Sequence, residues 1–275
     1  MTRIRLTVAG QSRSYLFAAP EAPAPWPVVV MLHGTGGTAA WCDSEVRLLE
    51  PALAAGFAIA YPDGLPLDPT KEPKFLTNPS RWNDGGTKPG DRLHTDSDDV
   101  GFLAAVVADL TGRGCDPARV CVAGFSNGAG MAFRFAAERS DLVAAAAPVA
   151  GYCWTDLKPA RPVPTLMICG DADPLIPWVG GRVRLPWGGL TAPRPGVPAT
   201  WAKWAVANGC AARPLLVEGF INMYAGPVPM VGLRVKGLGH HWPGGAGQLG
   251  AKLGGPNPAL IDGTRQVLGF FAKLG

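Results

Sequence analysis

Apolar and polar residues alternate over the first part of the chain and then give way to short apolar runs. The alternation within residues 4–8 and 14–18, on either side of Ala9-Gly10-Gln11, predicts an antiparallel hairpin. Continuous apolar runs are typical of strands that are buried on both faces. We expect such strands at residues 28–32, 57–61, 120–122, 143–149 and 164–169, and a broken strand pair at residues 215–217 and 230–235.

Segments that favour helix lie between these strands. We expect helices at residues 39–54, 96–112, 129–138, 200–208 and 257–274. The run Asp96-Ser97-Asp98-Asp99 suits a helix start, because side-chain oxygens accept hydrogen bonds from the free N–H groups there. Strands that alternate with helices predict an α/β fold with a mostly parallel central sheet and helices on both faces. Such a sheet binds ligands beyond the carboxyl ends of its strands.

The composition fits one globular domain over residues 1–275. Hydrophobic residues make up 47% of the chain and charged residues 17%, which excludes a disordered protein. The net charge is +4, but the basic residues are scattered, so we expect no nucleic-acid partner. No apolar run is long enough to span a membrane, and residues 1–5 lack the core of a signal peptide. We expect a cytoplasmic protein, or an extracellular one if a signal segment has been removed; the oligomeric state stays open.

The cysteines give no sign of a metal site. There are six of them and none shows C-x-x-C spacing, so we expect no zinc, and we expect no other metal or cofactor. Cys121 and Cys169 fall in predicted core strands, where a thiol acts as a small apolar side chain. The sequence assigns no disulfide.

The segment with the clearest chemistry is Gly124-Phe125-Ser126-Asn127-Gly128, which lies between a predicted strand and a predicted helix. Gly-x-Ser-x-Gly in this setting is the nucleophile elbow of α/β-hydrolases. The serine occupies a strained turn that exposes its hydroxyl, and the glycines let strand and helix cross closely. We therefore expect an α/β-hydrolase fold in which Ser126 forms a covalent acyl-enzyme.

A serine hydroxyl needs a base, and histidine is suited to this role because its pKa lies near neutrality. His240 is our choice, since it follows the last predicted strand in the glycine-rich loop Gly237-Leu238-Gly239-His240-His241-Trp242-Pro243-Gly244. His241 is the competing candidate, and is otherwise expected to line the cleft. His33 is expected to brace its own loop through hydrogen bonds, and His94 to lie at the surface.

The third group should be a carboxylate that orients the histidine and stabilises its cation. Gly170-Asp171-Ala172-Asp173-Pro174 is an acidic loop directly after a predicted strand. We favour Asp173, and expect Asp171 to cap the turn by bonding to the backbone. The resulting order along the chain, Ser126, Asp173, His240, is that of α/β-hydrolases.

An oxyanion formed at the substrate carbonyl needs preorganised N–H donors. The backbone N–H of Asn127, directly after the nucleophile, should be one of them. The second donor should come from His33-Gly34-Thr35-Gly36-Gly37, a glycine-rich loop after the strand at residues 28–32, and we assign it to Thr35.

The chain has nine tryptophans, most of which we expect in the core. Trp41, Trp82, Trp178 and Trp242 fall in loops that are predicted to lie near the cleft. Two of these loops, residues 62–94 and 178–197, are long and rich in Pro and Gly. Aromatic faces there would suit an aryl ester, a sugar ring or a polyester chain as ligand. Ordinary loop packing is the alternative for each of the four.

Four segments together resemble the polyhydroxybutyrate depolymerase and feruloyl or acetylxylan esterase family. The resemblance implies Ser126, Asp173 and His240 as a triad, Trp242 as a wall of the acyl site, one catalytic domain and no cofactor. Two departures from the family pattern, at Cys169 and Ala129, leave the substrate preference open. The four segments are Leu32-His33-Gly34-Thr35-Gly36-Gly37, Asp98-Asp99-Val100-Gly101-Phe102, residues 119–131 and Gly239-His240-His241-Trp242-Pro243-Gly244, within a likeness over residues 3–272.

These features predict a serine carboxylesterase that acts on short-chain or aromatic esters. The substrate would be a small-molecule or polymeric ester, either a feruloyl or acetyl ester or a polyester such as polyhydroxybutyrate. A serine peptidase of the same fold is a second interpretation, although no lid or propeller that would select peptides is evident. A non-catalytic binding protein on a hydrolase fold is a third, and the presence of all three triad residue types argues against it.

Overall fold

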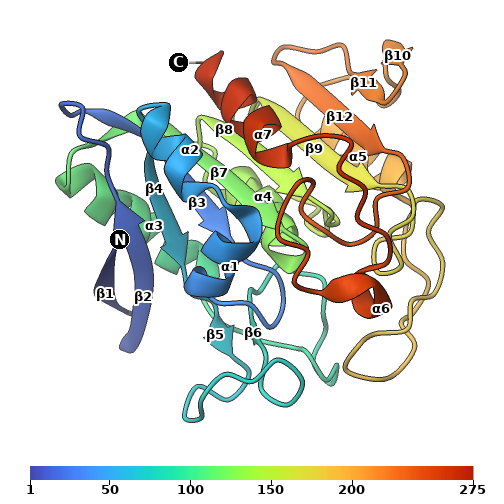
Figure 1. Cartoon of the computed structure of the whole chain (residues 1–275), viewed down its shortest axis with the longest axis horizontal. Coiled ribbons are helices and arrows are strands. Elements are labelled where there is room, and N and C mark those ends of the chain that lie inside the picture. Colours follow the sequence, from blue (N-terminus) through green and yellow to red (C-terminus); the bar gives the residue numbers. More distant parts are fainter. Residues whose placement is uncertain (275) are drawn as a thin grey trace.

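A mixed ten-stranded sheet runs through the molecule (Figure 1). In the computed structural model, which describes residues 1–274, its order is β1-β2-β4-β3-β7-β8-β9-β12-β11-β10. Neighbours from β4 to β12 run parallel, whereas the pairs at both edges are antiparallel. The bounds are β1 Thr2–Val8, β2 Gln11–Ala18, β3 Trp26–Leu32, β4 Ala58–Pro62, β7 Cys115–Phe125, β8 Ala145–Val149, β9 Thr165–Gly170, β10 Leu216–Glu218, β11 Ile221–Met223 and β12 Met230–Val235.

Helices cover both faces of this sheet, as the continuous apolar strands predict. In β3, Val28 and Val30 join one core cluster with residues of α3, α4 and α5, while Val29 and Met31 join another with residues of α1, α2 and α7. The expected α/β-hydrolase class with an N-terminal hairpin is thus confirmed. The helices are α1 Ala39–Val46, α2 Leu49–Ala54, α3 Asp99–Gly112, α4 Asn127–Glu138, α5 Val197–Ala207, α6 Gly250–Gly254 and α7 Gly263–Ala272.

Several helix boundaries differ from the predictions. The expected helix at residues 39–54 is divided into α1 and α2, because Arg47 adopts a left-handed conformation with φ 55° and ends the first helix. The closing helix begins only at Gly263, where the Asp262 side chain accepts from the Arg265 N–H. Helix α6 was not predicted. The acidic run before α3 does provide a cap, since Asp98 accepts from the Gly101 N–H at 2.8 Å.

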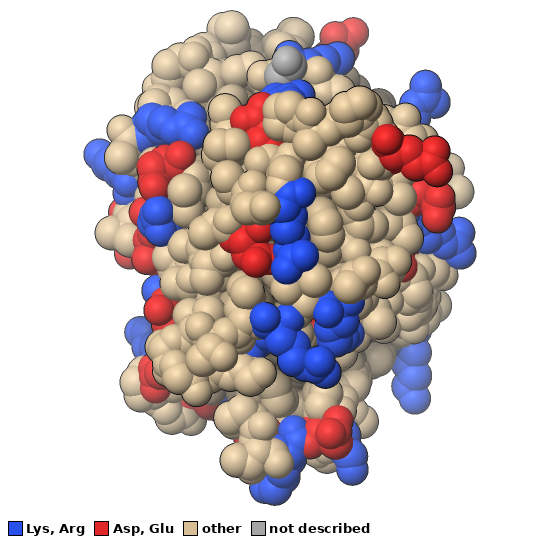
Figure 2. All heavy atoms as spheres, turned by 90° about the vertical axis from the view of Figure 1, so that its left-hand side faces the viewer, with Lys and Arg blue, Asp and Glu red and all other residues tan. Residues whose placement is uncertain are grey.

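The two long loops carry little regular structure. Within residues 62–94, β5 (Leu65–Pro66) and β6 (Ser80–Arg81) form a small separate sheet. On the face that carries the N-terminal hairpin, Figure 2 shows basic and acidic side chains interspersed, with one small basic group. Across residues 1–274, the helices are all too short or too polar to cross a bilayer.

Candidate active site

Ser126 lies at the sharp turn between β7 and α4. Its backbone adopts φ 58° and ψ −118°, a strained conformation for a residue with a side chain. A Cβ atom on Gly124 would lie 2.1 Å from the Gly128 carbonyl oxygen, and one on Gly128 would lie 2.3 Å from the Leu32 carbonyl oxygen. Both positions therefore require glycine, as the sequence motif predicts, and the strand, helix and β3 loop meet tightly around the serine.

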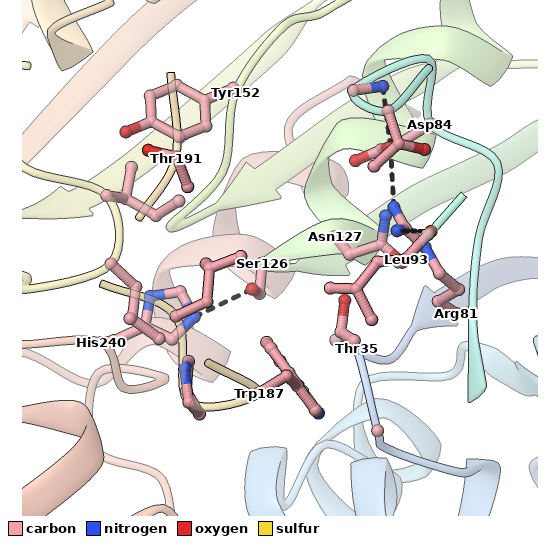
Figure 3. A pocket seen from close by; sticks show the side chains of 18 of the residues that line it. Thr35, Arg81, Asp84, Leu93, Ser126, Asn127, Tyr152, Trp187, Thr191 and His240 are labelled. Atoms are coloured by element: carbon pink, nitrogen blue, oxygen red, sulfur yellow. Dashed lines mark hydrogen bonds and ion pairs between the residues drawn. The ribbon is translucent and has the colours of Figure 1, made fainter. Parts of the chain in front are cut away.

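A continuous set of hydrogen bonds leads from Ser126 to Asp173. The His240 Nε2 lies 2.8 Å from the Ser126 Oγ, an interaction drawn in Figure 3, and the His240 Nδ1 lies 2.8 Å from the Asp173 Oδ2. The other Asp173 oxygen accepts from the N–H groups of Leu175 and Ile176, both at 2.8 Å. With the carboxylate fixed in this way, Nδ1 carries the imidazole proton and Nε2 faces the hydroxyl as an acceptor.

The two competing candidates make different contacts. His241 is buried, and its Nε2 donates to the Gly255 carbonyl at 3.1 Å. Asp171 accepts from the Gly237 N–H at 2.7 Å and from the Arg234 Nε at 2.9 Å, so it caps the turn as expected. The structure therefore brings His240 and Asp173, rather than their neighbours, to Ser126.

Two backbone N–H groups next to Ser126 are available as donors. Asn127 is the first residue of α4, a position whose N–H has no partner within a helix. Thr35 lies in the loop after β3, and among the described residues no backbone carbonyl accepts from its N–H. Both residues line the same cavity as Ser126, and Figure 3 shows them on the side of the serine away from His240.

Residues 80–82, which include β6, connect the segments that carry these two donors, and no sequence motif predicts this connection. The Trp82 Nε1–H donates to the His33 carbonyl at 2.9 Å, and the Gly36 N–H donates to the Ser80 carbonyl at 2.7 Å. The Asn127 side chain bonds to both the N–H and the carbonyl of Trp82, at 2.7 and 3.1 Å. Residues 80–82 thus brace the loop of one donor against the helix of the other.

The His33 ring holds its own loop, as expected. Its Nε2 accepts from the Gly64 N–H at 2.9 Å, and its Nδ1 donates to the Gly34 carbonyl at 2.7 Å. Burial lowers the pKa of His33, so the ring stays neutral and keeps both bonds. The His94 side chain is largely covered rather than exposed, and its Nε2 lies 2.9 Å from the Asp96 carboxylate instead of bonding to this loop.

A cavity of about 810 Å³ opens above Ser126 and His240. Residues 75–93 and 185–194 provide most of its outer wall. The two loops meet where the Trp187 Nε1–H donates to the Phe75 carbonyl at 2.5 Å, with ring centroids 5.4 Å apart. A cavity of this size at the carboxyl ends of parallel strands is a suitable site for a small organic molecule.

Comparison with known proteins identifies the family. Residues 13–179 match the profile of the dienelactone hydrolase family. The chain belongs to this family. It is 36% identical to NocK, a provisionally named esterase of Nocardia uniformis subsp. tsuyamanensis. The match covers 97% of this chain and 79% of NocK. It is 30% identical over 68% of its length to feruloyl esterase B of Piromyces equi, and spans about a third, 33%, of that protein.

Solved structures agree on the fold. The acetyl xylan esterase from Aspergillus awamori matches with a TM-score of 0.60 and 16% identity, over 92% of this chain and 98% of that one. An S-formylglutathione hydrolase from Agrobacterium tumefaciens matches with a TM-score of 0.60 and 14% identity, over 99% and 95% of the two chains. Together with the family assignment, the named relatives make this protein a carboxylic ester hydrolase.

The placement of several aromatic residues in this esterase corrects the sequence analysis. Trp41 lines the cavity as expected. Trp82 and Trp242, by contrast, are fully buried in the two core clusters, because each indole N–H finds a partner inside the protein: His33 for Trp82 and Thr264 for Trp242.

Trp178 and His241 are also absent from the cavity wall. Trp178 packs edge-on against Trp201, with ring centroids 5.4 Å apart, under the Arg234 guanidinium. His241 turns toward Gly255, as described above. The prediction that these residues line the cleft is wrong, and Phe75 and Trp187 take that position. The residues that the structure describes contain buried free thiols at all six cysteines and no cluster of metal-ligand side chains.

Proposed function

We propose that this esterase cleaves its substrates through an acyl-enzyme on Ser126. The observation that carries the proposal is the unbroken set of 2.8 Å contacts from the Ser126 Oγ through His240 to Asp173. His240 takes the hydroxyl proton as the oxygen attacks the ester carbonyl, and then gives it to the departing alkoxide. A water molecule activated by the same imidazole then cleaves the acyl-serine.

The negative charge that develops on the carbonyl oxygen would be met by the backbone N–H groups of Thr35 and Asn127. Each such donor is worth about 3 kcal/mol of transition-state stabilisation. The brace formed by residues 80–82 supports this role, because donors that are already fixed need no reorganisation during the reaction.

For the substrate we propose short-chain or aromatic carboxylic esters, including feruloyl or acetyl esters and polyesters such as polyhydroxybutyrate. Aromatic side chains of the cavity wall support this class, since flat rings pack well against one another. The 30% identity to a feruloyl esterase is consistent with it. The aromatic residues of the wall are Trp41, Phe75, Phe125, Tyr152, Trp154 and Trp187.

Replacement of the nucleophile tests the mechanism. We expect Ser126→Ala to lower kcat for p-nitrophenyl acetate by about 10⁵-fold or more. A fluorophosphonate probe should label the wild type at Ser126 and leave the variant unlabelled. Circular dichroism and the melting temperature provide the control that the fold is retained. Normal turnover by a folded Ser126→Ala variant would refute the proposal.

A further inference from the structure

The charge balance of the cavity wall differs from that of the rest of the surface. One basic residue, Arg81, is paired with Asp84 at 3.4 Å. The remaining lining carboxylate, Asp91, accepts from the backbone N–H of Lys88. Three further basic side chains line the cavity and have no carboxylate partner in residues 1–274: Lys88, Arg92 and Arg194. The wall therefore carries a net positive charge that the protein itself leaves uncompensated.

Arg194 is the one of these three that is held within the wall rather than at its rim. It is half-buried, whereas Lys88 and Arg92 are exposed. Its backbone N–H and carbonyl both bond to Gly181, at 2.8 and 3.0 Å. Its guanidinium carbon lies 5.5 Å from the centroid of the Tyr152 ring and 5.7 Å from that of Trp154. Two aromatic walls thus orient a guanidinium whose N–H groups have no acidic partner.

Tyr152 and Thr191 add neutral donors beside this cation. The Tyr152 hydroxyl is buried and finds no hydrogen-bond partner among residues 1–274, although most buried hydroxyls have one. Burial raises the pKa of Tyr152, so the hydroxyl keeps its proton at neutral pH. The Thr191 Oγ1 accepts from the Val183 N–H at 3.0 Å, which leaves its own proton free for a ligand. Figure 3 shows Tyr152 and Thr191 together, on the opposite side of Ser126 from Thr35.

We propose that Arg194, with Tyr152 and Thr191, binds a carboxylate group of the substrate, so that the preferred esters are anionic. A guanidinium presents two parallel N–H groups that match the two oxygens of a carboxylate. The uncompensated charge on Lys88 and Arg92 at the rim would draw such a substrate into the cavity. This inference rests on the proposed acyl-enzyme mechanism and deepens it, because it states which esters reach Ser126.

Two matched pairs of substrates test the inference and locate the carboxylate. Mono-4-nitrophenyl glutarate carries its charge on the acyl chain, and 4-nitrophenyl pentanoate is its neutral counterpart. 4-Acetoxybenzoate carries its charge on the leaving group, and its methyl ester is the neutral counterpart. We expect kcat/KM to favour the anionic member of at least one pair by about tenfold at low salt, and this preference to shrink in 0.5 M NaCl because exposed charges are screened.

The variants assign the preference to a residue. Arg194→Gln should raise KM for the preferred anionic ester by about tenfold or more and leave kcat/KM for the neutral esters within about twofold. Arg194→Lys should restore only part of the loss, because an ammonium lacks the paired N–H geometry. Arg184→Gln is the matched control: it removes the same charge from an exposed position of the same loop, outside the cavity wall, and should leave the preference unchanged.

The outcomes separate this inference from the mechanism on which it rests. Normal hydrolysis of all four esters without a charge preference, or a preference that survives Arg194→Gln, would overturn the carboxylate subsite and leave the Ser126 mechanism standing. Absence of hydrolysis of every ester, charged or neutral, would overturn both.

Discussion

His33 and His240 occupy comparable places in the molecule. Each follows the carboxyl end of a parallel strand, β3 or β12, and each is at least 98% buried, with exposed fractions of 0% and 2%. They differ in their partner atoms. Both His33 nitrogens bond to the backbone, whereas those of His240 face a carboxylate and a hydroxyl. Burial and position are thus shared, and only the partners distinguish a structural imidazole from one that can move a proton.

The largest expected effect separates the two histidines directly. Gln can fill either site without a charge, but cannot serve as a base. We expect His240→Gln to lower kcat for p-nitrophenyl acetate by about 10⁵-fold. His33→Gln should keep kcat within about tenfold, because the amide can still accept from the Gly64 N–H. Steady-state kinetics on variants with wild-type circular dichroism provide the measurement. Equal losses of kcat in the two folded variants would show that His33 is as important to the reaction as His240.

The two aspartates of the loop after β9, Asp173 and Asp171, allow a second comparison. Asp173→Asn places an amide N–H₂ against either the His240 Nδ1–H or the N–H groups of Leu175 and Ile176, so one donor must face another. The imidazole then favours the wrong tautomer, and we expect kcat to fall about 10⁴-fold. Asp171→Asn changes the same functional group two residues away, in a turn cap, and should cost less than tenfold. A larger loss of kcat for Asp171→Asn than for Asp173→Asn would show that Asp171, rather than Asp173, is the carboxylate that orients His240.

The elements around Ser126 could be predicted from sequence because local requirements determine them. Gly124 and Gly128 are forced by backbone contacts closer than a Cβ permits, and such constraints leave a motif. The buried strands are likewise visible as apolar runs, since both faces are covered. The expected positions of Thr35 and Asn127 beside the serine follow from the same strand-end geometry.

Most of the aromatic residues that line the cavity could not be predicted, although the two loops that carry them were expected near the cleft, because their orientation depends on contacts between loops distant in sequence. Trp82 and Trp187 both lie in Pro- and Gly-rich segments, and nothing local distinguishes them. The Trp82 indole donates to the His33 carbonyl, after β3, and is fully buried. The Trp187 indole donates to the Phe75 carbonyl and lines the cavity. An aromatic residue in a loop therefore indicates a buried anchor as readily as a binding surface. The position of the carbonyl that accepts from the indole N–H decides whether the ring is buried or lines the cavity.

The contact of Trp82, in the brace formed by residues 80–82, with the loop after β3 offers a third test. Trp82→Phe retains an aromatic ring but removes the bond to the His33 carbonyl. If the brace holds the loop of Thr35, kcat should fall about tenfold with KM within about twofold, since the donor acts on the transition state. Trp204→Phe is the matched control, because it removes one indole bond, to the Thr165 Oγ1, from a fully buried site in α5.

Both tryptophan variants should lose a similar amount of stability, about 1 kcal/mol in the free energy of unfolding. Only Trp82→Phe should change kcat. Equal kinetic effects would show that general loosening of the core, rather than the position of the loop that carries Thr35, lowers kcat.

The smallest effect concerns the pH dependence of stability. Because burial lowers the pKa of His33 in the folded protein, the unfolded chain, whose histidine titrates near 6.5, binds a proton more readily. The contribution of the neutral ring is therefore fully present above about pH 6.5 and is lost as the pH falls, by up to about 1.4 kcal/mol per pH unit. Urea unfolding between about pH 5 and pH 8 should show this slope in the wild type and a shallower one in His33→Gln. Identical slopes in the wild type and His33→Gln would mean that His33 binds a proton as readily in the folded as in the unfolded protein, and the contrast with His240 would then rest on reactivity alone.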